Sequence, residues 1–288
     1  MVCLSFLVRC LKFLKYVFPP SLHQSFFRSM GEWAVVTGAG DGIGKAYVLE
    51  LAKHGLNIVM ISRTLEKMQK VASEIEETTG RQVKIIQADF TKDDIYENIE
   101  ENIKGLEIGI LVNNVGMLPC LFPRNFLNGP DDDKSVINCN ITSATKMTRI
   151  ILKQMEQRRK GLILNISSAI GTFPCPLYAL YSASKVLSPY GVSTAMTGYP
   201  KINIITKNAN DFVRESLNYV TLGNETFGCL AHEILDFFIK LIPLWILHSD
   251  RVQKICMEVL SDAIKINKSR PLTISFDKIA LKKTEKLG

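Results

Sequence analysis

The chain has 288 residues, 47% of them hydrophobic, which is enough for one large α/β domain with appended segments. A net charge of +7 suits an anionic membrane surface or a phosphorylated cofactor. No block of Lys and Arg with interleaved aromatic residues is present, which argues against nucleic acid as a partner. Seven Cys without a Cys-x-x-Cys pair and four His without ligand spacing argue against a disulfide framework and a metal site, so a reducing compartment is expected.

The first 18 residues are apolar, except for basic residues that recur every three positions at Arg9, Lys12 and Lys15. This segment is shorter than the ~20 apolar residues that cross a bilayer, so it predicts an amphipathic helix lying in the membrane surface. A second apolar stretch, 237–247, is interrupted by Pro243 and has the same interpretation. Core helices are the alternative for both. The expected division is a membrane-associated segment at 1–28, a domain at 29–268 and a tail at 269–288.

After the N-terminal segment, apolar strands alternate with amphipathic helices as far as Tyr181, beyond which the alternation fails and only two helical patterns follow. The expected strands are 33–37, 57–61, 82–87, 108–113 and 162–166. The expected helices are 43–54, 65–78, 93–104, 133–159, 225–240 and 251–267. Near-continuous apolar strands joined by helices predict an α/β fold with a doubly wound parallel sheet of the Rossmann type, in the strand order 3-2-1-4-5.

The first expected strand runs into a glycine-rich turn that opens a helix. Its spacing, Thr-Gly-x-x-x-Gly-x-Gly, lets backbone amides and the helix N-terminus approach a pyrophosphate closely. An ordinary tight turn is the alternative, but the strand before it and the helix after it favour a dinucleotide site. The residues expected to contact the cofactor here are Thr37, Gly38, Asp41, Gly42, Ile43 and Gly44.

The end of the second strand indicates which dinucleotide binds. NAD sites usually carry an acid there, whereas this chain has Ser62 and Arg63. A hydroxyl and a guanidinium suit a 2′-phosphate, which predicts NADP(H), unless Arg63 is only a solvated surface residue. Asp89 ends the third strand, where a carboxylate would meet the adenine amino group. Asn113 and Gly116 end the fourth strand, beside the expected ribose.

Four residues downstream suit carbonyl reduction. Tyr181 and Lys185 are four positions apart, so one helical turn places them on the same face. The ammonium would lower the pKa of the phenol towards neutral pH, where the phenol could donate a proton. Ser168 could hold the substrate oxygen. Asn140 could fix a water that relays protons through Lys185, although a satisfied buried amide is the commoner role.

Together these motifs resemble the short-chain dehydrogenase/reductase superfamily. Stretches at 88–96, 105–119 and 215–221 resemble its 17β-hydroxysteroid dehydrogenase branch more narrowly. The resemblance implies an endoplasmic reticulum enzyme that uses NADPH to reduce a 17-ketosteroid, androstenedione, to testosterone. The two apolar segments and the seven Cys predict that it is attached to the cytosolic face of that membrane. A very-long-chain 3-oxoacyl-CoA reductase is the rival on substrate, and a homodimer is left open.

The chain departs from the superfamily after Lys185. The loop that closes on the nicotinamide resembles residues 188–194 here, with Val192 and Thr194 in the contacting places. In the superfamily a helix and a sixth strand precede this loop, and a parallel crossover needs a dozen or more residues. We therefore expect one helix–strand unit to be missing, through a skipped exon or a faulty gene model. The alternative is a natural compact variant. The missing unit makes a catalytically impaired product, acting through cofactor, membrane or partner binding, the alternative to an active reductase.

Overall fold

The computed structural model describes residues 16–119, 133–168, 179–184, 192–194, 196–197, 200–203, 205–222, 226–242, 246, 249 and 251–252. Most of the expected N-terminal helix, the tail and Lys185 lie outside the described residues. Among the described residues, no helix is both long enough and apolar enough to cross a bilayer.

The central sheet has five parallel strands in the order β3-β2-β1-β4-β5, which confirms the predicted topology. Its strands are β1 (Trp33–Thr37), β2 (Asn57–Ser62), β3 (Val83–Gln87), β4 (Ile108–Asn113) and β5 (Leu162–Asn165). Side chains alternate between the two faces of the sheet, so Val36 packs in one core cluster and Val35 in the other. A sheet buried on both faces accounts for the unbroken apolar runs in the sequence.

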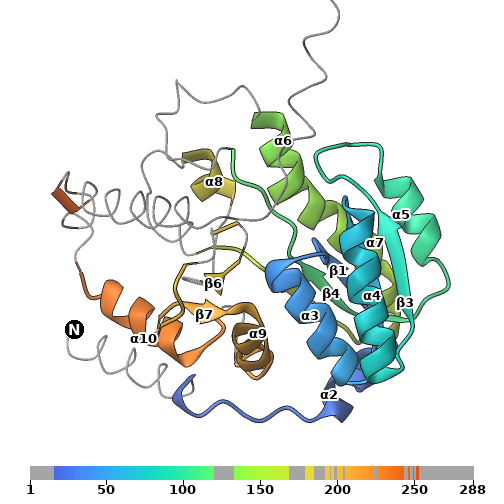
Figure 1. Cartoon of the computed structure of the whole chain (residues 1–288), viewed down its shortest axis with the longest axis horizontal. Coiled ribbons are helices and arrows are strands. Elements are labelled where there is room, and N and C mark those ends of the chain that lie inside the picture. Colours follow the sequence, from blue (N-terminus) through green and yellow to red (C-terminus); the bar gives the residue numbers. More distant parts are fainter. Residues whose placement is uncertain are drawn as a thin grey trace, which may run out of the picture.

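Helices cover both faces of this sheet (Figure 1). One face packs against α2 (Gln24–Met30), α3 (Gly42–Lys53), α4 (Leu65–Thr79) and α9 (Ala209–Leu217). The other packs against α5 (Tyr96–Ile103) and α7 (Ser143–Arg158). Helices α3, α4 and α5 were expected within a few residues of these bounds, whereas α2 and α9 were not.

The long helix expected over 133–159 contains a wider turn. It consists of α6 (Asp133–Ile137), a π-helical turn η2 (Asn138–Thr142) and α7. Such turns are uncommon and occur often at functional sites, because they redirect the side chains that they carry. This one holds Cys139 and Asn140, which are both buried.

The C-terminal part adds a small two-stranded sheet, and its helix α9 packs into the core of the main sheet. Strands β6 (Val192–Ser193) and β7 (Lys207–Asn208) pair in parallel, and α9 follows β7 directly. Helix α10 (Leu230–Ile239) begins five residues later than the expected helix at 225–240. The reason is Gly228, whose φ of 79° is incompatible with a right-handed helix. The helix expected at 251–267 falls almost wholly outside the described residues.

The two edge strands of the described sheet, β3 and β5, are less covered than the three inner strands. All six residues of β4 are buried, but the apolar residues Leu162, Ile163 and Leu164 of β5 are only partly buried, and Asn165 is exposed. In the described part of the chain, the five-stranded sheet ends at β5, and β6 pairs with β7 instead.

Candidate active site

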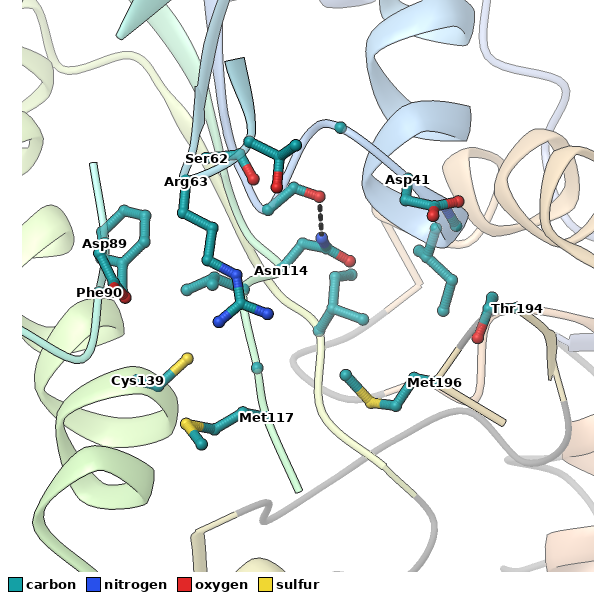
Figure 2. Close-up of a pocket in the computed structure, with 18 of the residues that line it drawn as sticks. Asp41, Ser62, Arg63, Asp89, Phe90, Asn114, Met117, Cys139, Thr194 and Met196 are labelled. Atoms are coloured by element: carbon teal, nitrogen blue, oxygen red, sulfur yellow. Dashed lines mark hydrogen bonds between the residues drawn. The ribbon is translucent and has the colours of Figure 1, made fainter. Parts of the chain in front are cut away.

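A pocket runs along the carboxyl ends of the strands, and both the glycine-rich turn and Tyr181 line it. Figure 2 shows this pocket, with Asp41, Arg63 and Met196 among the labelled residues. In open parallel sheets this edge is where ligands bind. Ten of the expected site residues line the pocket: Gly38, Asp41, Gly42, Ile43, Ser62, Arg63, Asp89, Gly116, Tyr181 and Thr194.

Close packing shapes the glycine-rich turn. A Cβ atom at Gly38 would lie 2.9 Å from Nδ2 of Asn114, and one at Gly44 would overlap the carbonyl oxygen of Gly38. Asn114 donates from Nδ2 to the carbonyl oxygens of Thr37 (2.9 Å) and Gly38 (3.3 Å). Thr37 accepts at Oγ1 from the backbone of Asn114 at 3.0 Å. The turn is thus fastened to the end of β4, with its backbone facing the pocket.

Basic and hydroxyl side chains gather at the end of β2. Figure 2 shows Arg63 reaching into the pocket between Asp89 and Asn114. Thr64 is the N-cap of α4 and makes no side-chain capping bond, so its hydroxyl does not occupy the first amides of that helix. Lys67, one turn further on, also lines the pocket. This end of the pocket is suited to an anion.

Asp89 and Asn113 differ in their placement. Asp89 lines the pocket and accepts at Oδ1 from the backbone and hydroxyl of Thr91. Asn113 lies away from the pocket lining, since its Nδ2 donates to Thr148 (3.0 Å) and Asn165 (2.8 Å). Asn113 therefore braces β4 against α7 and β5, because its side chain leaves the strand on the α7 side.

Tyr181 and Ser168 come together as expected. Tyr181, on α8 (Ala179–Ser184), is only 5% exposed, and a side-chain hydrogen bond joins it to Ser168. Burial raises the pKa of Tyr181 above its ordinary value of 10.0, and the bond to Ser168 opposes this shift only partly. The lowering of this pKa by Lys185 remains a prediction, because Lys185 lies outside the described residues.

Asn140 links the helix of Tyr181 to the end of β4. Its Oδ1 accepts from the backbone N–H of Met117 (2.8 Å), and its Nδ2 donates to the carbonyl of Met117 (3.0 Å). The same Nδ2 lies 2.8 Å from Oγ of Ser184, the last residue of α8. Both ends of the amide thus have protein partners, and Asn140 positions α8 against the pocket. Its role in a proton relay remains a prediction.

The last two residues expected to contact the cofactor, Thr194 and Val192, differ in placement. Thr194 lies against the glycine-rich turn, 3.2 Å from where a Cβ of Gly42 would be. Val192 is buried in the core below and does not line the pocket. Met196, which was not expected, places its sulfur 4.0 Å from the hydroxyl of Tyr181. The segment after β6 therefore closes the pocket over both the turn and the tyrosine.

These features fit a nicotinamide dinucleotide. The glycine-rich turn forms a cradle that side chains would fill, at the N-terminus of α3, where backbone amides favour phosphate. Ser167 lines the same pocket, and its Oγ is buried without a protein partner. A buried hydroxyl of this kind is costly unless a ligand or water pairs with it.

Sequence reasoning missed several residues of the pocket. The missed residues that matter most are Lys67, Asn114, Met117, Cys139 and Met196. Lys67 could have been predicted from the sequence, since it follows Arg63 by four positions at the start of an expected helix. The sulfur-bearing residues had none, because the loops and the π-helical turn that carry them follow no simple periodicity.

Comparisons with known proteins agree with this geometry. The family model described as short chain dehydrogenase matches residues 32–209. The human 17-beta-hydroxysteroid dehydrogenase type 3 is 59% identical, over 93% of this chain and 94% of its own length. The very-long-chain 3-oxoacyl-CoA reductase of Anas platyrhynchos is 43% identical, over 74% and 77%.

Solved structures are similar as well. A 7beta-hydroxysteroid dehydrogenase superposes with a TM-score of 0.66 over 84% of this chain and 99% of its own, at 21% identity, which speaks for the fold alone. A metagenomic short-chain oxidoreductase in complex with NADP is 30% identical, with a TM-score of 0.50 over 54% of this chain and 69% of its own. The chain therefore belongs to the short-chain dehydrogenase family, whose members are nicotinamide-dependent oxidoreductases.

Proposed function

We propose that this protein is an NADPH-dependent 17-ketosteroid reductase that converts androstenedione to testosterone. The observation that carries the proposal is the hydrogen-bonded pair of Tyr181 and Ser168, at one end of a pocket whose other end holds Arg63. The 59% identity to the human type 3 enzyme supports a steroid as the substrate.

Each residue of the site has its own role in the proposed reduction of the carbonyl group. The cofactor supplies the hydride when it is bound. Tyr181 donates a proton to the carbonyl oxygen, and Ser168 donates a hydrogen bond to that same oxygen. Lys185 provides the positive charge that brings the phenol nearer to neutral pH, against the opposing effect of burial. Asn140 holds α8, and with it the phenol, at the pocket.

The choice of NADPH rests on the end of β2. No acid stands there to bind a ribose hydroxyl, and Arg63 points into the pocket beside Ser62 (Figure 2). The glycine-rich turn binds the part that NADPH and NADH share. Only the 2′-phosphate distinguishes the two dinucleotides, so Arg63 would act on NADPH alone.

Replacing Arg63 by alanine is therefore expected to weaken NADPH binding by about tenfold or more and to leave NADH binding nearly unchanged. Calorimetric titration of each cofactor measures this directly, and Arg63→Lys is the control that keeps the charge but loses the planar fork. An equal loss for both cofactors would refute the assignment of Arg63 to the 2′-phosphate.

The rival substrate is a very-long-chain 3-oxoacyl-CoA, because a reductase of that kind is 43% identical. The two reactions use the same acid and hydride, so catalytic residues cannot discriminate between them. Rates of NADPH oxidation with androstenedione and with a 3-oxoacyl-CoA, each also tested as a competitor of the other, do discriminate. Faster turnover of the acyl-CoA would overturn the steroid proposal.

A second candidate function is a catalytically impaired product that lacks one helix–strand unit after Lys185. The alignment to the human relative extends over 292 positions but uses 93% of the 288 residues, so about 24 positions of the relative have no counterpart here. Strand β5 is an edge of the described sheet, where a further strand could pair. Such a chain would retain the glycine-rich turn and Arg63, and with them cofactor binding.

We also propose attachment to the cytosolic face of the endoplasmic reticulum membrane. On and just after α10, Ile234, Phe238, Leu241 and Ile242 are exposed at helical spacing, with Phe238 60% exposed. Phe18, in the N-terminal segment, is 80% exposed. Two apolar contacts together with basic residues are enough for stable binding, where one alone is marginal. We keep the tail at 269–288 but place the start of the reductase domain at α2, because Phe27 is fully buried against the sheet. The proposed membrane-associated segment is then residues 1–23.

The double variant Phe238→Glu/Leu241→Glu is expected to lower the fraction bound to anionic vesicles several-fold, because a carboxylate at each contact opposes insertion. Flotation with phosphatidylserine vesicles measures that fraction. Leu152→Glu is the matched control, since Leu152 is exposed and apolar but lies on α7. Equal binding of all three proteins would contradict the assignment to α10, and glycosylation of Asn224 in cells would place the domain in the lumen instead.

A further inference from the structure

We propose that Lys67 is a second cation for the 2′-phosphate of NADP(H), and that Asp41 competes with that phosphate for the same ammonium group. The inference rests on the proposed preference for NADPH and adds a residue and a counter-charge to it. It concerns only side chains at the junction of the glycine-rich turn, the end of β2 and the start of α4.

Packing places Lys67 beside the residues already assigned to the phosphate. A Cβ atom at Gly40 would lie 3.3 Å from Cβ of Lys67 and 3.8 Å from Oγ of Ser62. Gly40, Ser62, Arg63 and Lys67 all line the pocket. Lys67 lies in the first turn of α4 and Arg63 directly follows β2, so the two cations line the same end of the pocket from two neighbouring elements.

The ammonium of Lys67 is paired with Asp41. Its Nζ lies 2.7 Å from Oδ2 of Asp41, while Oδ1 of Asp41 accepts from the backbone N–H of Gly42 at 2.7 Å. The two side chains are 54% and 42% exposed. An exposed pair of this kind contributes little free energy, because solvent screens it and both side chains lose freedom. A phosphate of higher negative charge is therefore an effective competitor for the ammonium.

Asp41 remains a carboxylate at neutral pH. Burial raises its pKa, but hydrogen bonds from Lys67 and Gly42 and the charges of Lys67 and Lys45 outweigh burial and hold this pKa below the ordinary 3.8. A permanent negative charge at the N-terminus of α3 stands where the pyrophosphate is expected to bind. Lys67 screens that charge, so its loss would weaken the binding of both cofactors slightly. The binding of NADPH would weaken further, because its 2′-phosphate would also lose a cation.

Removal of Asp41 should have the opposite effect. Asparagine caps a helix as well as aspartate does, so Asp41→Asn keeps the cap of α3 and removes the charge that holds Lys67. The freed ammonium would then serve the 2′-phosphate alone. The increased preference for binding NADPH over NADH should vanish when Lys67 is also replaced. The two single variants and the double variant thus form a double-mutant cycle.

The experiment measures dissociation constants for NADPH and NADH by calorimetry, on the full chain and four variants. Lys67→Ala is expected to lower the ratio of the NADH to the NADPH constant by about tenfold. Asp41→Asn is expected to raise that ratio, and Asp41→Asn/Lys67→Ala is expected to match Lys67→Ala. Lys70→Ala is the matched control, because Lys70 is an exposed lysine of α4 outside the pocket lining.

The outcomes separate this inference from the proposed function. If Arg63→Ala lowers the ratio but Lys67→Ala behaves like Lys70→Ala, the inference is wrong and the preference for NADPH stands. A rise in the ratio for Asp41→Asn that persists without Lys67 also overturns it. If the unaltered chain shows no preference between the cofactors, or binds neither, the proposed use of NADPH fails and the inference fails with it.

Discussion

Insertion of a helix–strand unit after Lys185, which the second candidate function takes to be missing, is expected to raise ketosteroid reduction at least about 100-fold. The inserted segment would be a helix and a strand of roughly 20 residues, placed between Lys185 and Val186. Tyr181 and Lys185 cooperate only if one helical turn holds both, and a helix takes most of its stability from packing a continuous face. Small displacements of a catalytic acid cost about two orders of magnitude in rate.

The burial of Tyr181 is the reason why its phenol is expected to depend on such a unit. Tyr181 is almost fully buried, and burial raises its pKa. A hydrogen bond to Ser168 does not reverse that shift, so a nearby positive charge is needed to make proton transfer efficient near neutral pH. In the proposed mechanism Lys185 supplies this charge, which requires that its side chain be held towards Tyr181.

The measurement is NADPH oxidation with androstenedione by the chain as it stands and by the extended chain. A Gly/Ser insert of the same length is the control for chain length, and Tyr181→Phe in the extended chain should remove the gained activity. Equal turnover by the original and extended chains would show that the chain needs no further helix and strand.

Gly44→Ala is expected to abolish cofactor binding and to destabilise the domain by about 3 kcal/mol. The new Cβ would overlap the carbonyl oxygen of Gly38 and lie 2.5 Å from Nδ2 of Asn114. These atoms belong to the turn and to the side chain that fastens it to β4, so neither can yield without opening the cradle.

Gly40→Ala is the matched control in the same turn. Its Cβ would meet only side-chain atoms of α4 and Ser62, the closest at 3.3 Å, and its stability should change by less than about 1 kcal/mol. Thermal unfolding and calorimetric titration of both variants test the prediction. A Gly44→Ala protein with unaltered stability and NADPH affinity would contradict the packing described for the turn.

Local sequence patterns were sufficient for the sheet and the cofactor end of the site. Five apolar strands separated by amphipathic helices predict a parallel sheet with helices on both faces. The predicted strand order 3-2-1-4-5 is confirmed. The glycine-rich turn is predictable because two backbone segments approach each other too closely for any side chain. At Gly44, for example, a Cβ atom would overlap the carbonyl oxygen of Gly38. Helix α10 begins late because Gly228, a single residue with positive φ, outweighs the apolar pattern before it.

The sequence by itself therefore determined the family, the parallel sheet, the glycine-rich turn, and Ser62 and Arg63 at the end of β2. Only the tertiary structure decided that Asn113 braces the sheet, that Asn140 links α8 to Met117, and that Lys67 meets Asp41 at the pocket. The physical reason is the range of the interactions. Strands, turns and caps follow from neighbours in sequence, whereas a pair such as Lys67 and Asp41, 26 positions apart, is set by how α4 packs beside α3.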